Sequence, residues 1–179
     1  MSVKSATARG LTSGLEPGLV LLNNTSFSGV LSQSINDVFS ATYDSYRIIF
    51  YRDSLVTSSS GTNLRLRVSG SDLTSGYSYA KVGVKSNNTT QTFYITGATE
   101  LGLTDSSDSE GKAIIIDVAN PFRTIDKTFQ FQNFGYTGGV QAWFNTMGWV
   151  DSTTSYTGFT LTNDSGNMTG SVSVYGYSK

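Results

Sequence analysis

Residues 158–179, GFTLTNDSGNMTGSVSVYGYSK, decide the fold more clearly than any other stretch of the chain. Phe159 and Leu161 alternate with threonines, and after a turn rich in Asn, Asp and Gly the period of two returns at Val172 and Val174. The pattern predicts a C-terminal β-hairpin. Because an isolated two-stranded ribbon is only marginally stable in water, we expect this hairpin to be built into a larger sheet.

The rest of the chain repeats the strand pattern and shows no convincing helical period. The clearest segments are Tyr46–Arg52 (YRIIFYR), Asn63–Ser69 (NLRLRVS) and Lys112–Val118 (KAIIIDV), which Asn120-Pro121 ends. Stretches rich in Ser, Thr and acidic residues, 53–62 and 101–111, are predicted as loops. About ten short strands over residues 19–179 predict one all-β domain, an antiparallel β-sandwich resembling a jelly roll.

The length and charge of the chain limit its partners. Its 179 residues suit a single domain with one core. Only 14% of the residues are charged and the formal net charge is −1, so the chain lacks the basic surface that binds nucleic acid or an anionic membrane. No apolar run is long enough for a transmembrane helix. We therefore expect no nucleic-acid partner and no membrane insertion.

The chain contains neither cysteine nor histidine. This removes disulfides, thiol nucleophiles, His-based triads and the usual ligands of zinc, copper and haem. An enzyme would have to use a carboxylate pair, a Lys or Tyr base, or a cation held by oxygen ligands. We expect no enzymatic activity and no cofactor.

Acidic residues offer two weak alternatives to that expectation. Asp105, Ser107, Asp108, Ser109 and Glu110 could ligate calcium, but Gly111 falls too late for an EF-hand loop, and an exposed, solvated acidic loop is the preferred interpretation. A carboxylate pair for glycoside hydrolysis could be drawn from Asp44, Asp53 and Asp117. Aspartates at strand ends more often stabilise turns, and the sequence does not fix the separation that hydrolysis needs.

Aromatic residues provide the main candidate binding site. Flat rings can stack on the apolar faces of sugars while neighbouring amides bond the hydroxyls, and pockets of this composition are typical of binding sites. Two Trp residues in one meander can equally fill a core. The candidate ligand contacts are Phe134, Tyr136, Trp143 and Trp149, with the amides of Gln130, Gln132 and Asn145 beside them.

The first 18 residues form a predicted N-terminal arm. They lack sustained periodicity and contain several Gly residues and a Pro. The arm either frays or becomes ordered on a partner, with Lys4, Arg9, Leu11 and Leu15 as the residues able to add a strand or place charge on that partner.

The order of these segments resembles a group of small β-rich virion proteins of tailed bacteriophages. The resemblance spans most of residues 18–179. It is carried by GLVLLNNTSFSG, VFSATYDSYRIIF, LRLRVSGSD, the ANPF turn and GSVSVYGY, of which VFSATYDSYRIIF and GSVSVYGY are the most distinctive. It implies a non-enzymatic structural role and brings no catalytic residues.

The resemblance implies a place on the exterior of the particle, after synthesis in the bacterial cytoplasm. One placement is a jelly-roll module of the tail or fibre apparatus that binds a host-surface glycan. The alternative is a capsid decoration, or cement, protein that clamps the major capsid protein, and a capsule-degrading enzyme is a remote third. By analogy with virion jelly rolls we expect a homotrimer that attaches to other virion proteins through Lys4, Arg9, Leu11 and Leu15 of the arm.

Overall fold

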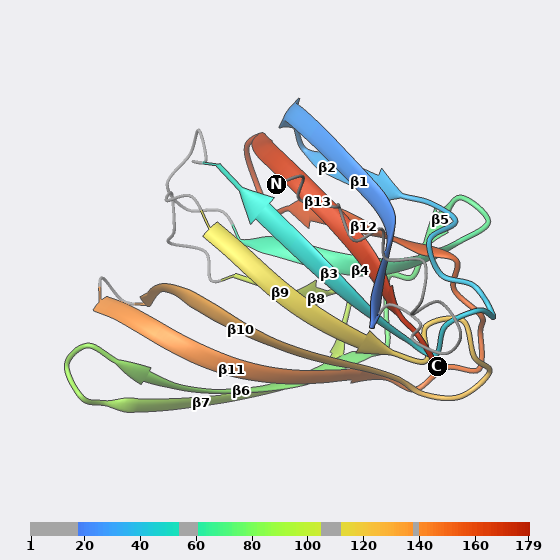
Figure 1. Ribbon diagram of the computed structural model, residues 1–179. Helices are drawn as coiled ribbons and strands as arrows, with labels where there is room; N and C mark the ends of the chain where they lie inside the picture. The colour runs from blue at the N-terminus through green and yellow to red at the C-terminus, as the bar shows by residue number, and fades with distance from the viewer. Residues whose placement is uncertain (1–17, 54–60, 105–111, 138–139) are drawn as a thin grey trace, which may run out of the picture.

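The computed structural model describes residues 18–53, 61–104, 112–137 and 140–179, and all of their regular structure is β-strand. Two antiparallel sheets pack face to face, with the larger sheet nearer the viewer in Figure 1. The predicted all-β antiparallel sandwich is therefore confirmed, while its description as a jelly roll stays a prediction. Lys4, Arg9, Leu11 and Leu15 of the predicted arm and the acidic segment Asp105–Glu110 lie outside the described residues.

The larger sheet contains eight strands, and each strand is antiparallel to its neighbours. In spatial order they are β1 (Leu19–Val30), β13 (Met168–Tyr177), β3 (Ser45–Arg52), β9 (Lys112–Ala119), β10 (Lys127–Thr137), β11 (Val140–Val150), β6 (Tyr77–Lys85) and β7 (Thr90–Ala98).

The smaller sheet has β2 and β4 on the two sides of β12, and two very short strands cover the other edge of β4. Its strands are β2 (Ser32–Ile35), β12 (Gly158–Asn163), β4 (Thr62–Val68), β5 (Ser71–Asp72) and β8 (Leu101–Gly102). The prediction of a loop over 101–111 is thus wrong at its start, where Leu101 and Leu103 are buried in the core.

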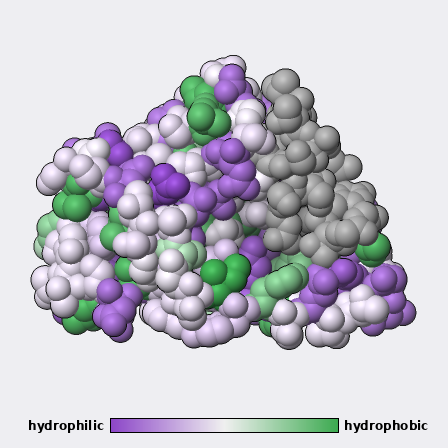
Figure 2. Space-filling model, turned by 180° about the vertical axis from the view of Figure 1, so that it is seen from behind, coloured by the Kyte–Doolittle hydropathy of each residue, from purple (hydrophilic) through white to green (hydrophobic). Residues whose placement is uncertain are grey.

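Seen from behind, the surface is mainly neutral or hydrophilic, with hydrophobic colour in small separate areas (Figure 2).

The predicted C-terminal hairpin is wrong in its pairing. Both segments are strands, but β12 pairs with β2 and β4 in the smaller sheet, whereas β13 lies between β1 and β3 in the larger one. Phe159 and Leu161 therefore face Val172 and Val174 through the core instead of sharing a ladder. A period of two specifies a strand with one buried face, but it does not specify the neighbouring strand.

Alternation along each strand separates the core from the outer faces. In β3 the side chains of Tyr46, Ile48 and Phe50 are fully buried, and the residues between them are more exposed. The same rule divides the apolar run of β9, where Ile114 and Ile116 are buried but Ile115 is on the outer face, about half exposed.

A buried tyrosine joins the two sheets. The edge of β4 is left open between β5 and β8, and there the hydroxyl of Tyr77 on β6 accepts a hydrogen bond from the backbone N–H of Leu66 at 2.6 Å. The same hydroxyl donates to the carbonyl of Leu73 at 3.3 Å. Desolvation in this position raises the pKa of Tyr77 strongly, so the hydroxyl keeps the proton that it donates.

A buried lysine holds two loops at one end of the sandwich. The fully buried Lys127 donates from Nζ to the carbonyls of Arg123 and Ser152, each at 2.6 Å, and to that of Ile125 at 2.5 Å. The ammonium also lies 5.7 Å from the ring centre of Tyr156. It thereby connects the loop after β9 to the loop after β11, and desolvation lowers its pKa.

Replacing this lysine should be costly. We expect Lys127→Met to lower the free energy of unfolding by about 3 kcal/mol, because a side chain of similar length would leave three carbonyls without their donor. Urea denaturation measures the change. Lys85→Met, at the end of β6, is the matched control and should change stability by less than about 0.5 kcal/mol. A loss below about 1 kcal/mol for Lys127→Met would show that the loops do not depend on the ammonium.

Candidate functional site

The outer face of the larger sheet brings part of the predicted aromatic site together. Phe134 on β10 is directly opposite Trp143 on β11, and their side chains are 47% and 45% exposed. The core-facing positions of β11 are occupied by other residues: Ala142, Phe144, Thr146, Gly148 and Val150. Trp143 is therefore not core filler, and it forms with Phe134 an exposed aromatic pair.

Amides adjoin this pair on the same face. Gln132 is opposite Asn145 in the next row of the β10–β11 ladder, and Gln130 follows opposite Met147. The Oδ1 atom of Asn145 is buried and has no hydrogen-bonding partner. The predicted combination of rings and amides is thus present around Phe134 and Trp143, as neighbouring rows of one sheet.

A groove runs beside these residues where two strands separate. β9 and β10 pair only between Ile115–Ala119 and Thr128–Gln132, whereas β10 continues along β11 as far as Thr137. A cavity of about 480 Å³ occupies the region where the β9–β10 ladder ends. Its lining includes Ala113, Ile115, Gln130, Gln132, Phe134 and Trp143.

The polar end of the groove is built by an ion pair between neighbouring strands. Arg47 on β3 donates from Nε and Nη2 to the two carboxylate oxygens of Asp117 on β9, each at 2.8 Å. The hydroxyl of Tyr177 donates to Asp117 Oδ1 at 2.8 Å, and the guanidinium lies 5.5 Å from the Tyr177 ring centre. Three of roughly four acceptor positions of the carboxylate are used, which leaves one on Oδ2 for a ligand.

These hydrogen bonds keep both Arg47 and Asp117 charged. The hydrogen bonds from Arg47 lower the pKa of Asp117, and in turn Asp117 raises the pKa of Arg47. Asp117 therefore stays ionised at neutral pH and is an acceptor there, which is unfavourable for a general acid. Of the other aspartates considered for hydrolysis, Asp44 is paired with Arg123 at 3.0 Å and with Lys179 at 3.3 Å.

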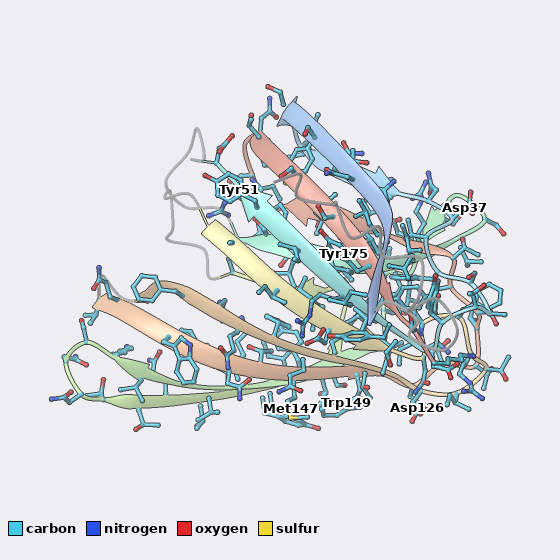
Figure 3. All side chains as sticks on the ribbon, viewed as in Figure 1. Asp37, Tyr51, Asp126, Met147, Trp149 and Tyr175 are labelled. Carbon is cyan, nitrogen blue, oxygen red and sulfur yellow. The ribbon has the colours of Figure 1, made fainter. Side chains whose placement is uncertain are left out.

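The structure places Trp149 outside the groove, away from the Phe134–Trp143 pair. It is six residues beyond Trp143 on the same strand, about 20 Å away at the usual strand rise. Its ring packs against Tyr94 of β7, with centroids 6.0 Å apart. Met147 and Trp149 leave β11 on the same side of the sheet (Figure 3). The predicted set of four aromatics is thus divided, and Tyr136 is placed only by its backbone, which pairs with Gln141.

Sequence reasoning missed the contribution of Arg47, Ile115 and Tyr177 to this end of the sheet. Arg47 and Asp117 are 70 positions apart, so no local pattern could pair them. The one available signal was the middle Ile of KAIIIDV. If only one face of this strand is buried, alternation exposes Ile115 between the buried Ile114 and Ile116.

Neither a metal site nor a membrane helix is found in what the structure describes. Within the described ranges no cluster of three or more Asp, Glu, His or Cys side chains could bind a metal ion. Across the same ranges no helix is long and apolar enough to span a membrane.

The ion pair predicts a pH effect. Asp117 has a lowered pKa when folded, so its contribution to stability is present above its unfolded pKa of about 3.9 and is lost as the pH falls through the folded value. We expect Arg47→Met to raise the pKa of Asp117, as followed by NMR titration of its carboxyl carbon. Arg67→Met removes the Arg67–Asp72 pair on the smaller sheet and should leave the pKa of Asp117 unchanged. An unmoved Asp117 in Arg47→Met would contradict the assigned cause.

Comparison with protein-family models gives no match for this sequence, and comparisons with curated proteins and with solved structures give none either.

Proposed function

We propose that this chain is a non-enzymatic binding module that takes an uncharged glycan in the groove between β9 and β10, on the exterior of a tailed-phage particle. The observation that carries the glycan proposal is the exposed Phe134–Trp143 pair beside amides in one groove. The virion setting is supported by the sequence resemblance of VFSATYDSYRIIF and GSVSVYGY.

The aromatic end and the polar end of the groove each match a chemical feature of a sugar. A sugar ring has an apolar face of C–H groups, which can pack on an exposed aromatic ring and replace water there. Its hydroxyls need donors and acceptors, which Gln130, Gln132 and the free Oδ2 position of Asp117 supply. The sugar can therefore lie along the groove with its apolar face on Trp143.

The paired charges in the groove favour an uncharged ligand. The only ionised side chains that line the described part of the groove are Arg47 and Asp117, and they neutralise each other through a bidentate pair. A strongly acidic or basic ligand would find no unpaired opposite charge here. We therefore expect recognition by stacking and hydrogen bonds, as a neutral host polysaccharide would require.

The two Trp residues provide a matched test. On an array of neutral and acidic saccharides, we expect the wild-type protein to bind at least one neutral glycan. Trp143→Ala should weaken that binding at least ten-fold, because it removes the stacking ring. Trp149→Ala deletes the same side chain on the same strand outside the groove and should retain binding. Circular dichroism checks that both variants fold. Equal binding by wild type and Trp143→Ala, or binding to no saccharide at all, would contradict the proposal.

Salt dependence gives a second test. Since the groove contains no unpaired charge, we expect the affinity for the neutral glycan to change less than about two-fold between 50 and 500 mM NaCl. Isothermal titration calorimetry measures the affinity at each salt concentration. A steep loss of affinity with salt would indicate a charged ligand and would rule out the stacking mechanism as the main source of binding.

A further inference from the structure

The outer edge of β7 is an open strand edge. β7 ends the larger sheet and pairs only with β6 in the part of the chain that the structure describes, and it forms the lower border of the sheet in Figure 1. From Thr90 to Ile95 its register with β6 is continuous, so six successive residues keep a straight edge. Such an edge presents unpaired backbone N–H and C=O groups in the spacing that another strand can meet.

Both faces of β7 expose large apolar side chains. Tyr94 is 65% exposed on the outer face, and Phe93 and Ile95 are 41% and 38% exposed on the other face. On the outer face the apolar surface continues over β6 and β11 through Val82, Val84 and Met147, each about half exposed. A hollow of about 550 Å³ lies among Val82, Tyr94 and Met147.

The usual protections of an edge are missing from β7. The strand TQTFYITGA contains no charged residue and no proline, and its one register irregularity comes after Ile95. By contrast β1, the opposite edge of the same sheet, is interrupted by two register shifts. At the edges of the smaller sheet β2 has four residues, and β5 and β8 have two each. Long, uncharged and regular edges invite strand pairing, so monomeric proteins normally block them.

We propose that β7 pairs antiparallel with β7 of a second copy of this chain, around a two-fold axis, so that the larger sheets of the two copies form one continuous sheet. In this arrangement the edge hydrogen bonds are satisfied on both sides. Phe93, Tyr94 and Ile95 of each copy then pack against the partner strand on both faces.

The occupant is a second copy because the edge is complementary to itself. Two neutral strands meet without like-charge repulsion, and an isologous contact needs no second specialised surface. The large apolar side chains that such a contact covers are those of β7 itself, Phe93, Tyr94 and Ile95, and they add to the hydrogen bonds of the backbone edge. A dissimilar partner would normally be selected by charges, which this edge does not have.

This contact is independent of the glycan groove. The groove is centred where β9 and β10 separate, and β11 and β6 lie between β10 and β7. The pairing also differs from the homotrimer expected by analogy with virion jelly rolls, and the mass of the assembly distinguishes the two.

The absence of cysteine allows a direct test. In a two-fold antiparallel pair one residue is opposite its own copy, and each step away adds about 7 Å between the two equivalent residues. We therefore expect single cysteines introduced at every position of residues 90–98 to form intermolecular disulfides with one sharp maximum within 90–96. A flat profile, as pairing of β7 with a different strand would give, overturns the proposal.

Sedimentation supplies the second measurement. We expect the full chain to form a dimer and Thr92→Lys to raise its dissociation constant at least ten-fold, because the substitution places one charge from each copy within an otherwise uncharged contact. Lysine is tolerated on exposed edges, and circular dichroism verifies the fold. Ser26→Lys on the β1 edge is the matched control and should leave the dimer intact. A monomer at 200 µM, a trimer, or an equal effect of both lysines overturns the proposal.

Discussion

The crossing from β12 to β13 constrains the whole sandwich, because the chain leaves the smaller sheet at Asn163 and enters the larger one at Met168, in the strand next to the β1 edge. Four residues make this passage, so the two sheets must lie close together at this point. The crossing is fastened to β4 by Asp164, which accepts from the backbone N–H of Gly61 at 3.0 Å and from the Asn63 amide at 2.7 Å. A Cβ on Gly61 would lie 2.6 Å from the Asp164 carboxylate, so a side chain there would disturb this junction.

The unequal sizes of the two sheets determine which surfaces remain for binding. Eight strands cannot be covered by the much shorter smaller sheet, and long twisted sheets tend to split instead of staying flat. Here β9 follows β3 along its whole length while β10 follows β11, so the ladder between β9 and β10 ends early. The groove is a direct result of that division. The ion pair of Arg47 with Asp117 connects β3 to β9 on one side of it.

Local patterns predicted the strands and part of the site for a clear reason. Alternation and turn residues are properties of neighbouring positions, so β3, β4 and β9 could be placed from sequence. Phe134 and Trp143 come together because they are only nine positions apart, on two strands that pair directly. The pairing of β12 and β13, the binding of Lys127 by three carbonyls and the Arg47–Asp117 pair depend on segments far apart in the chain, and no periodicity encodes them. Trp149 is close to Trp143 in sequence but not in space, because six residues of extended strand separate the two side chains.

Regular alternation within β10 separates its core-facing residues from the exposed Phe134. Phe129 and Phe131 point into the core, and Asn133 continues that face as a buried amide whose two polar atoms have no partner. Phe134 is the next residue and is therefore on the outer face, opposite Trp143. Had the third Phe been at position 133, the rule of alternation would have buried it and left no ring beside Trp143. The strand thus has a polar residue, Asn133, at a core position where an unsatisfied amide is unfavourable, and an aromatic residue, Phe134, at an exposed position. A sequence selected only for stability would place these two side chains the other way round, which supports a binding role for the outer face.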